Sequence, residues 1–394
     1  MSRSVLISGA SIAGPALAYW LSRYGFTVTV VEKASAVRGG GYPIDARGPA
    51  VEVLRRMGLL EAARERHVAT RRITFLDAGG AQLAQIEPEE LTGGVAGQDI
   101  ELRRGDLTDL LYGAVRDEAE FRFGDSITTL DDHGDGVDVT FRSGLRRTFD
   151  LVIGADGLHS NTRTLVFGPE KQFHHYLGYC FAGFTAPNYL GLSHEAVTWT
   201  VAGRTATLYA TDDSERMHGF LSFSREDAPL HAFADPAAQR DLVASYFTGD
   251  GWEVPRLVET MRSADDLFFD VVSQIRMPVW SKGRVVLAGD AAHATSFLSG
   301  QGSSLALIGA YLLAYELADA EHPAAFAAYD RRAREFMTRN QDLAPAGALM
   351  LSPRTEEELA ARNAALRDPD GLPAETSREV HSNLTLPPER VVTG

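Results

Sequence analysis

Two segments far apart in the chain share one pattern: an apolar strand breaks at a glycine into a turn, and a helix follows. The first segment covers residues 5–14 (VLISGASIAG), and the second covers residues 284–293 (RVVLAGDAAH). Turns of this kind leave the free N–H groups of the first helical turn available to bind a phosphate or another anionic group. One such turn indicates a nucleotide. Two on one chain predict a long cofactor that is held at both ends, and FAD fits that description.

The first turn carries the residue types that a dinucleotide site needs. Gly9 permits a tight turn, and Gly14 lets the helix approach the strand closely. Glu32 ends the next strand, where a carboxylate accepts hydrogen bonds from a ribose and repels a 2′-phosphate. We therefore predict that the adenosine half of FAD or NAD, rather than NADP, binds here, and the candidate residues are Gly9, Ser11, Ile12, Ala13, Gly14, Glu32 and Lys33.

Ser11 leaves room for other interpretations of this turn. It replaces the middle glycine of the dinucleotide fingerprint, which narrows the approach to the phosphates but adds a hydroxyl that can donate a hydrogen bond. The same segment is one residue short of the nucleophile elbow of an esterase, with Ala13 where the last glycine belongs. An ordinary strand–helix turn is the third alternative. We favour the dinucleotide site because an elbow normally follows several strands, and because a ribose explains Glu32 better.

Composition excludes several classes of protein. The chain has 394 residues, 44% of them hydrophobic, which is enough for two or three packed units. Its net charge of −15 disfavours binding to nucleic acid or to an anionic membrane. No apolar run is long enough to span a bilayer, since Glu316 interrupts the best candidate at residues 305–317. No charged-then-apolar leader opens the sequence, so we expect a cytoplasmic protein.

Cysteine and histidine usage argues against a metal site. Cys180 is the only cysteine, which excludes an internal disulfide and a thiolate cluster, and we expect it to be a buried apolar residue. His174 and His175 are neighbours in a predicted strand, so they point to opposite faces and cannot share a metal. His293 is expected to be structural.

The order of predicted elements indicates an α/β fold with a β-rich insertion. Residues 1–171 and 276–345 are predicted to form one discontinuous FAD-binding domain, and residues 172–275 a β-rich substrate-binding domain with its own sheet. Residues 346–394 are predicted to hold a C-terminal helix and a loose tail. A single helix is expected over residues 51–66.

At this point the chain resembles the class A flavoprotein monooxygenases, which have the p-hydroxybenzoate hydroxylase fold. It is most similar to their tetracycline-inactivating branch. The resemblance covers roughly residues 3–345 and rests on three ordered motifs: the Gly9–Gly14 turn with Glu32, residues 154–163 (GADGLHSNTR), and Gly289-Asp290 followed by residues 300–302 (GQG). It implies a Rossmann-like FAD-binding domain, an inserted β-rich substrate domain and C-terminal helices.

The resemblance also implies roles for individual residues. Arg38 is similar to a contact for NADPH, and Asp45 and Arg104 are similar to contacts for FAD. The second and third motifs add further cofactor candidates: Asp156, Gly157, Gly289, Asp290, Gly300, Gln301, Gly302 and Ser303. The helix that begins near Gly302 presents free N–H groups and a partial positive charge, which would stabilise the negative charge of reduced flavin.

Two positions depart from the family pattern. Phe297 stands where the family usually has proline, beside the reactive edge of the flavin, and Ser304 stands where it often has asparagine. Both departures bear on oxygen activation and substrate choice rather than on flavin binding. The predicted substrate contacts are Trp199, Met217, Phe220, Phe223 and Phe297, although for any one residue of the insertion a place in the core of its sheet is the stronger alternative.

The activity that the resemblance implies is hydroxylation of an aromatic or enolic small molecule. NADPH, or else NADH, reduces FAD, and O₂ then forms a flavin C4a-hydroperoxide whose distal oxygen passes to an electron-rich carbon. No side chain is expected to act as the catalyst, because the flavin supplies the chemistry and the protein orients it. We expect a small aromatic or polycyclic substrate and a monomer or weak homodimer. The alternatives are an FAD-dependent dehydrogenase or reductase of the same fold, and a noncatalytic flavoprotein that sequesters an antibiotic.

Overall fold

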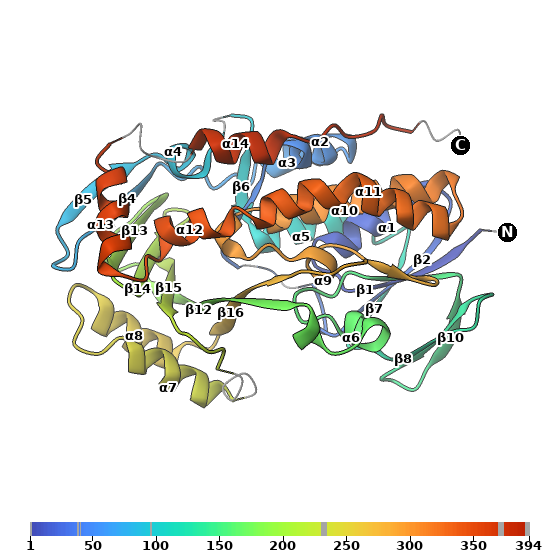
Figure 1. Cartoon of the computed structure of the whole chain (residues 1–394), viewed down its shortest axis with the longest axis horizontal. Coiled ribbons are helices and arrows are strands. Elements are labelled where there is room, and N and C mark those ends of the chain that lie inside the picture. Colours follow the sequence, from blue (N-terminus) through green and yellow to red (C-terminus); the bar gives the residue numbers. More distant parts are fainter. Residues whose placement is uncertain are drawn as a thin grey trace.

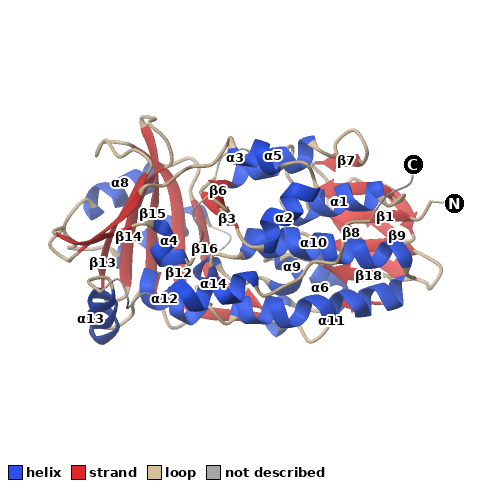
Figure 2. Cartoon of the chain, turned by 90° about the horizontal axis from the view of Figure 1, so that it is seen from above, coloured by secondary structure: helices blue, strands red, loops and turns tan. Residues whose placement is uncertain are grey.

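Two sheets, at opposite ends of an elongated molecule, organise the computed structural model of this chain (Figures 1 and 2). The structure describes residues 2–37, 39, 41–94, 97–229, 235–368 and 374–390. Within those residues, no helix is both long enough and apolar enough to cross a membrane. The predicted α/β architecture, with a parallel sheet and a second β-rich region, is confirmed.

The first sheet is six-stranded and lies between helices on one face and a small sheet on the other. Its strands run in the order β17 (Ser281–Lys282), β18 (Val285–Leu287), β11 (Leu151–Gly154), β1 (Ser4–Ser8), β2 (Thr27–Glu32) and β7 (Glu120–Phe123). All neighbours are parallel except β17 and β18. The central strands are buried on both faces, which is why they read as continuous apolar runs in the sequence.

Alternate residues of β1 show what covers each face. Val5 and Ile7 join the large core beneath the helices, whereas Leu6 joins the core beneath the three-stranded sheet. The helices are α1 (Ala13–Arg23), α5 (Arg104–Gly113), α10 (Gly302–Asp319) and α11 (His322–Gln341), and the small sheet contains β8 (Ile127–Asp132), β9 (Val137–Phe141) and β10 (Arg146–Phe149). Trp20 of α1 meets Tyr311 of α10 edge to face, with ring centroids 4.9 Å apart.

The second sheet is seven-stranded and is wider than predicted. Its order is β16 (Phe268–Ile275), β12 (His174–Pro187), β15 (Arg216–Ser224), β14 (Arg204–Ala210), β13 (Glu195–Val201), β4 (Arg72–Leu76) and β5 (Gln82–Ile86). The predicted boundaries placed residues 72–86 with the FAD-binding part, but β4 pairs in parallel with β13. A parallel partner comes from a distant part of the chain, so this pairing leaves no local signal. Helices α7 (Pro236–Tyr246) and α8 (Val254–Ser263) cover one face of the sheet.

A short ribbon and several small helices connect the two sheets. The ribbon pairs β3 (Pro43–Ala46) with β6 (Ile100–Arg103) in antiparallel fashion. The helix expected over residues 51–66 is two helices, because Gly58 has a φ of 72° and ends the first one. The short helices are α2 (Pro49–Arg56), α3 (Leu60–Arg64), α4 (Pro88–Thr92), α6 (Asn161–Phe167) and α9 (Asp290–His293), with single 3₁₀ turns at Glu170–Gln172 and Phe297–Ser299.

The C-terminal part contains the helix predicted there and also a helix within the segment that was expected to be a loose tail. It contains α12 (Ala344–Leu351), α13 (Glu356–Ala365) and α14 (Ala374–Ser382). The segment after α14 lies against α2 and α10, where the Pro387 carbonyl accepts hydrogen bonds from Arg56 at 2.6 Å and from the Tyr311 hydroxyl at 3.1 Å. Side-chain donors on the helices therefore anchor a segment whose own sequence has no helical or strand periodicity.

Candidate cofactor and substrate site

The two glycine turns predicted to hold one cofactor meet in space. Gly289, at the end of β18, has a φ of 59°, and a Cβ there would lie 3.0 Å from the Ala13 Cβ and 3.8 Å from the Ala306 Cβ. It therefore lies where α1 and α10 both pass close to the end of the sheet. Because the carboxyl ends of parallel strands share one edge, both turns open toward the same side.

Both glycines of the first turn are required by close backbone contacts. Gly9 has a φ of 109°, and a Cβ on it would lie 2.4 Å from the Ala155 carbonyl oxygen. A Cβ on Gly14 would lie 1.9 Å from the Gly9 carbonyl oxygen, so the start of α1 packs directly on the turn. Ile12 and Ala13 are buried at the helix start. The turn is thus a rigid cradle at a helix N-terminus, as a pyrophosphate site requires.

Polar groups around this turn already have protein partners. The Glu32 carboxylate accepts hydrogen bonds from the backbone N–H groups of Ala10 and Ala34, each at 2.9 Å. Arg104 donates to the Ser11 hydroxyl at 2.8 Å, which places the predicted FAD contact of α5 beside the first turn. A carboxylate has lone pairs left to accept a ribose hydroxyl after two such bonds.

Two further cofactor candidates, Lys33 and Arg38, follow β2. Lys33 is exposed. Arg38, the predicted NADPH contact, lies outside the described residues.

The second motif holds the fold together at the end of β11. The Asp156 carboxylate accepts hydrogen bonds from the Thr162 N–H at 2.9 Å and the Thr162 hydroxyl at 2.8 Å, and also from Ser8 at 3.2 Å. Asp156 therefore fixes the start of α6 to β1. Gly157 has a φ of 83°, which explains the glycine at this turn. The cofactor contact expected for Asp156 and Gly157 stays a prediction.

Asp290 faces an interior space that water can reach. Its side chain is accessible, yet protein surrounds it, and this desolvation raises its pKa while the charge of Arg104 opposes the rise. A Cβ on Gly302, the first residue of α10, would have the Asp290 carboxylate as its nearest neighbour at 3.9 Å. The carboxylate and the α10 N-terminus therefore line the same space.

The residues just before α10 fit a polar, planar ligand. Gly300 has a φ of 65° and ends the 3₁₀ turn. The Gln301 side chain is only 1% exposed, and its Nε2 has no hydrogen-bond partner among the described residues. Ser303 is partly buried in the first turn of α10. Together with the glycine cradles, this orphaned amide meets the requirements of bound FAD, because a buried N–H group needs an acceptor.

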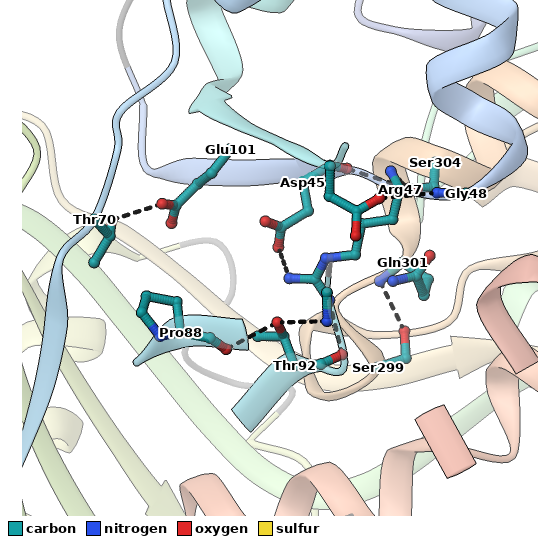
Figure 3. A network of polar contacts seen from close by, with 12 residues as sticks. Asp45, Arg47, Gly48, Thr70, Pro88, Thr92, Glu101, Ser299, Gln301 and Ser304 are labelled. Atoms are coloured by element: carbon teal, nitrogen blue, oxygen red, sulfur yellow. Dashed lines mark hydrogen bonds and ion pairs between the residues drawn. The ribbon is translucent and has the colours of Figure 1, made fainter. Parts of the chain in front are cut away.

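Arg47 is a site residue that the sequence analysis missed. Its Nη2 forms an ion pair with Asp45 at 2.6 Å, and its side chain is almost fully buried (Figure 3). Its backbone N–H donates to the Ser304 hydroxyl at 3.1 Å, and that hydroxyl donates to the Asp45 carbonyl at 3.2 Å. Ser304 therefore ties β3 to α10, and Arg47 lies beside Gly300. The sequence did hold one signal for Arg47: side chains two residues apart in a strand point to the same side, which places Arg47 with Asp45.

An aromatic cluster lies between the seven-stranded sheet and the 3₁₀ turn that precedes α10, which we call the α10 turn. It contains Tyr42, Phe181, His218, Phe220 and Phe297. The Phe297 ring is 4.9 Å from Phe181, and Phe181 stacks on Phe220 at 5.5 Å. Tyr42 and His218 are each 6.2 Å from Phe220. Of the predicted substrate contacts, Phe220 and Phe297 are thus brought together beside the cofactor site.

The other three predicted substrate contacts are packing residues. Trp199, Met217 and Phe223 are at most 2% exposed and belong to the core under α7 and α8. Trp199 donates its indole N–H to the Ala78 carbonyl at 3.1 Å, and Phe223 stacks on Tyr246 at 4.0 Å. Alternation along β15 explains the split: Phe220 faces the cluster, whereas Met217 and Phe223, three residues away on either side, face the core.

His293 and Cys180 are structural. His293 is 3% exposed, and burial lowers its pKa to about 4, so it is neutral at physiological pH. Its ring lies 5.0 Å from Trp280, and its Nε2 lies 3.4 Å from the Tyr329 hydroxyl. Burial raises the pKa of the Cys180 thiol to about 11, which disfavours the reactive thiolate. The predicted burial of Cys180 is confirmed, and the structural role of His293 stays a prediction that its burial supports.

Comparison with known proteins gives consistent matches over nearly the whole chain. A family model described as an FAD binding domain matches residues 2–344. An uncharacterized protein of Mycobacterium tuberculosis is 46% identical over 374 residues, covering 93% of this chain and 100% of that protein. A flavin-dependent monooxygenase from an unknown prokaryotic organism is 40% identical over 341 residues, covering 86% of this chain and 88% of its own length. The crystal structure of tetracycline destructase Tet(55) superposes with a TM-score of 0.85 at 36% identity, covering 98% of this chain and 99% of its own.

Proposed function

Because the chain belongs to the FAD-binding family of class A flavoprotein monooxygenases, we propose that it hydroxylates a flat phenol or enol of the aromatic polyketide or tetracycline type. The observation that carries this substrate class is the aromatic cluster beside the α10 turn. Phe297, Phe181 and Phe220 form a continuous aromatic surface there. Such a surface favours a planar, polycyclic ligand, because offset stacking adds to the burial of apolar area.

FAD, when bound, accepts electrons from NADPH or NADH and activates O₂ for transfer to carbon. The chain's own residues bind and orient it. The glycine cradle at Gly9 and Gly14 would receive the pyrophosphate, and Glu32 would accept hydrogen bonds from the adenosine ribose. Asp290 would accept hydrogen bonds from the ribityl chain.

The start of α10 would act on the flavin ring. Its free N–H groups and partial positive charge favour negative charge on the ring, and the orphaned amide of Gln301 can donate a hydrogen bond to it. Phe297 would cover the reacting edge and exclude water. The positions of these residues support the roles proposed for them, and none of the roles needs a side chain to form a covalent bond.

One experiment separates hydroxylation from the two alternatives. Purified protein with FAD is mixed with NADPH, O₂ and each member of a panel of phenols, aromatic polyketides and tetracyclines. Substrate-stimulated NADPH consumption with a product one oxygen atom heavier supports hydroxylation. A product two hydrogen atoms lighter would instead assign dehydrogenation. Tight binding of an antibiotic without NADPH consumption would assign sequestration.

A further inference from the structure

A buried carboxyl group lies at the seam between the ribbon and the seven-stranded sheet. Glu101 of β6 accepts a hydrogen bond from the Tyr209 hydroxyl at 2.5 Å and another from the Thr70 hydroxyl at 2.6 Å. Thr70 and Tyr209 also contact each other through their hydroxyl oxygens. Each carboxyl oxygen therefore has a hydroxyl partner, and the three groups form a closed hydrogen-bonded triad (Glu101 and Thr70 in Figure 3).

The charges around Glu101 favour a carboxyl that can exchange a proton. Burial raises its pKa, and Asp45, its cross-strand neighbour on β3, adds to the rise; the two hydroxyl donors and Arg47 lower the pKa. His67 contacts only the Glu101 backbone. Burial also raises the pKa of Tyr209, so the phenol stays protonated at rest. Both side chains are nevertheless partly accessible to solvent.

The Tyr209 side chain lies on the same face of the sheet as part of the aromatic cluster. Tyr209 lies directly opposite His218 in the pairing of β14 with β15, and Thr207 lies opposite Phe220. Directly opposed residues point to the same face of a sheet, so Tyr209 shares its face with His218 and Phe220. Tyr42, the residue before β3 of the ribbon, contacts Phe220 as well. A substrate held on the aromatic surface would therefore meet the Tyr209 hydroxyl.

We propose that Glu101, acting through Tyr209, is the base that removes the hydroxyl proton of the substrate before oxygen transfer. This inference rests on the proposed function. The substrate O–H bond breaks as its proton passes to the Tyr209 oxygen, while the Tyr209 proton passes to Glu101. The electron pair stays on the substrate, which becomes a phenolate or enolate with a more nucleophilic ring carbon. The reverse transfer returns the proton to the product, so no further reactant is needed.

A purely structural triad would have a different signature. In that case Glu101 and Tyr209 would join the ribbon to the sheet, and their removal would lower stability without changing any pH dependence. Glu101→Gln is the informative variant, because glutamine keeps the shape but replaces one acceptor oxygen with an NH₂ donor and cannot titrate. Glu195→Gln is the matched control. Glu195 is a buried carboxylate of the same sheet, and its ion pair is with Arg72, away from the cluster.

The first measurement needs no substrate. Infrared difference spectra of the FAD-loaded protein are recorded across a pH titration, and the C=O stretch of protonated carboxyl groups is followed. We expect one titrating band to be lost in Glu101→Gln and retained in Glu195→Gln. Identical bands in the parent and Glu101→Gln would overturn the proposal, because Glu101 would then not exchange a proton.

The second measurement uses tetracycline as the probe. Flavin is reduced in advance, oxygen and tetracycline are added, and hydroxylated product is counted in a single turnover at several pH values. Glu101→Gln and Tyr209→Phe should each slow product formation about 10²- to 10⁴-fold near neutral pH, the range expected for a lost general base. The loss should shrink as rising pH ionises the substrate unaided. NADPH reduction of the flavin should not change.

Failure of this inference is distinguishable from failure of the proposed function. If the parent forms product and Glu101→Gln forms it with an unchanged pH profile, the proton acceptor is not Glu101, although the hydroxylase assignment stands. If the parent oxygenates no compound of the panel, the function and the inference both fall. A uniform drop at every pH in Glu101→Gln, with lowered stability, would overturn the inference in favour of the structural triad.

Discussion

Replacing Gly302 by alanine should leave the folded protein intact and weaken FAD binding. An added Cβ would have only the Asp290 carboxylate within contact range, at 3.9 Å, and Gly302 is helical without a positive φ. The substitution therefore breaks no contact in the apoprotein, and it raises the free energy of unfolding by up to about 1 kcal/mol because alanine is the better helix former. The methyl group would, however, project beside Asp290 into the space assigned to the flavin. Overpacking of this kind costs about 1–3 kcal/mol, which corresponds to a roughly 5- to 150-fold rise in Kd.

The assay compares two quantities on the same preparations. Apoprotein is made by removing FAD, its unfolding temperature is measured, and FAD is then titrated back by following flavin fluorescence. Gly113→Ala is the control, since Gly113 ends α5 with open space around its Cβ position and no positive φ. It should match Gly302→Ala in apoprotein stability and match the parent in FAD affinity. An unchanged Kd in Gly302→Ala would refute the placement of the flavin at the α10 start.

Three further outcomes are expected. Glu32→Ala should weaken FAD binding by about 1.5–3 kcal/mol through lost ribose hydrogen bonds. It should also lower the apoprotein unfolding temperature, because the backbone donors of Ala10 and Ala34 lose their acceptor. Tight FAD binding by this variant would contradict the ribose assignment. Phe297→Ala should keep FAD and its reduction rate but release more hydrogen peroxide per product, since the ring no longer excludes water; an unchanged peroxide yield would mean that Phe297 only packs on Phe181. Unfolding free energy should fall as the pH drops from about 6.5 toward about 4, because unfolded His293 takes up a proton that its buried, low-pKa folded form refuses. In urea titrations at several pH values, His293→Gln should reduce this acid-side loss of unfolding free energy. An unchanged dependence on pH would mean that other groups cause the loss.

The sequence predicted the parts of the site that depend on local chemistry. The turns at Gly9 and Gly289 were recognisable because strand, glycine and helix follow one another within a few residues, and each signal has a direct steric cause. Both glycines have positive φ in the structure, and each lies close to a neighbouring segment. The start of α10 was predictable for the same reason.

The remaining parts depend on pairings that no short segment reveals. Arg47 enters the site because β3 pairs with β6 and packs against Ser304 of α10. Glu101 meets Tyr209 only because two different sheets come together. Periodicity alone also could not choose which face of β15 would be the core, so Phe220 and Phe223 looked equivalent. The docking of the segment after α14 likewise depends on donors supplied by Arg56 and Tyr311.

The order of strands in the six-stranded sheet governs how the chain can fold as it is synthesised. β1 pairs with residues 151–154, and those residues pair in turn with residues 285–287. A nascent chain must therefore keep β11 without its second partner while strands β12 to β16 of the seven-stranded sheet are being made. Contacts of such long sequence separation form slowly, and unpaired strand edges invite aggregation meanwhile. Because both ends of the cofactor site are complete only after Gly302 has emerged, FAD can bind only after that point, and its binding stabilises the six-stranded sheet that β18 completes.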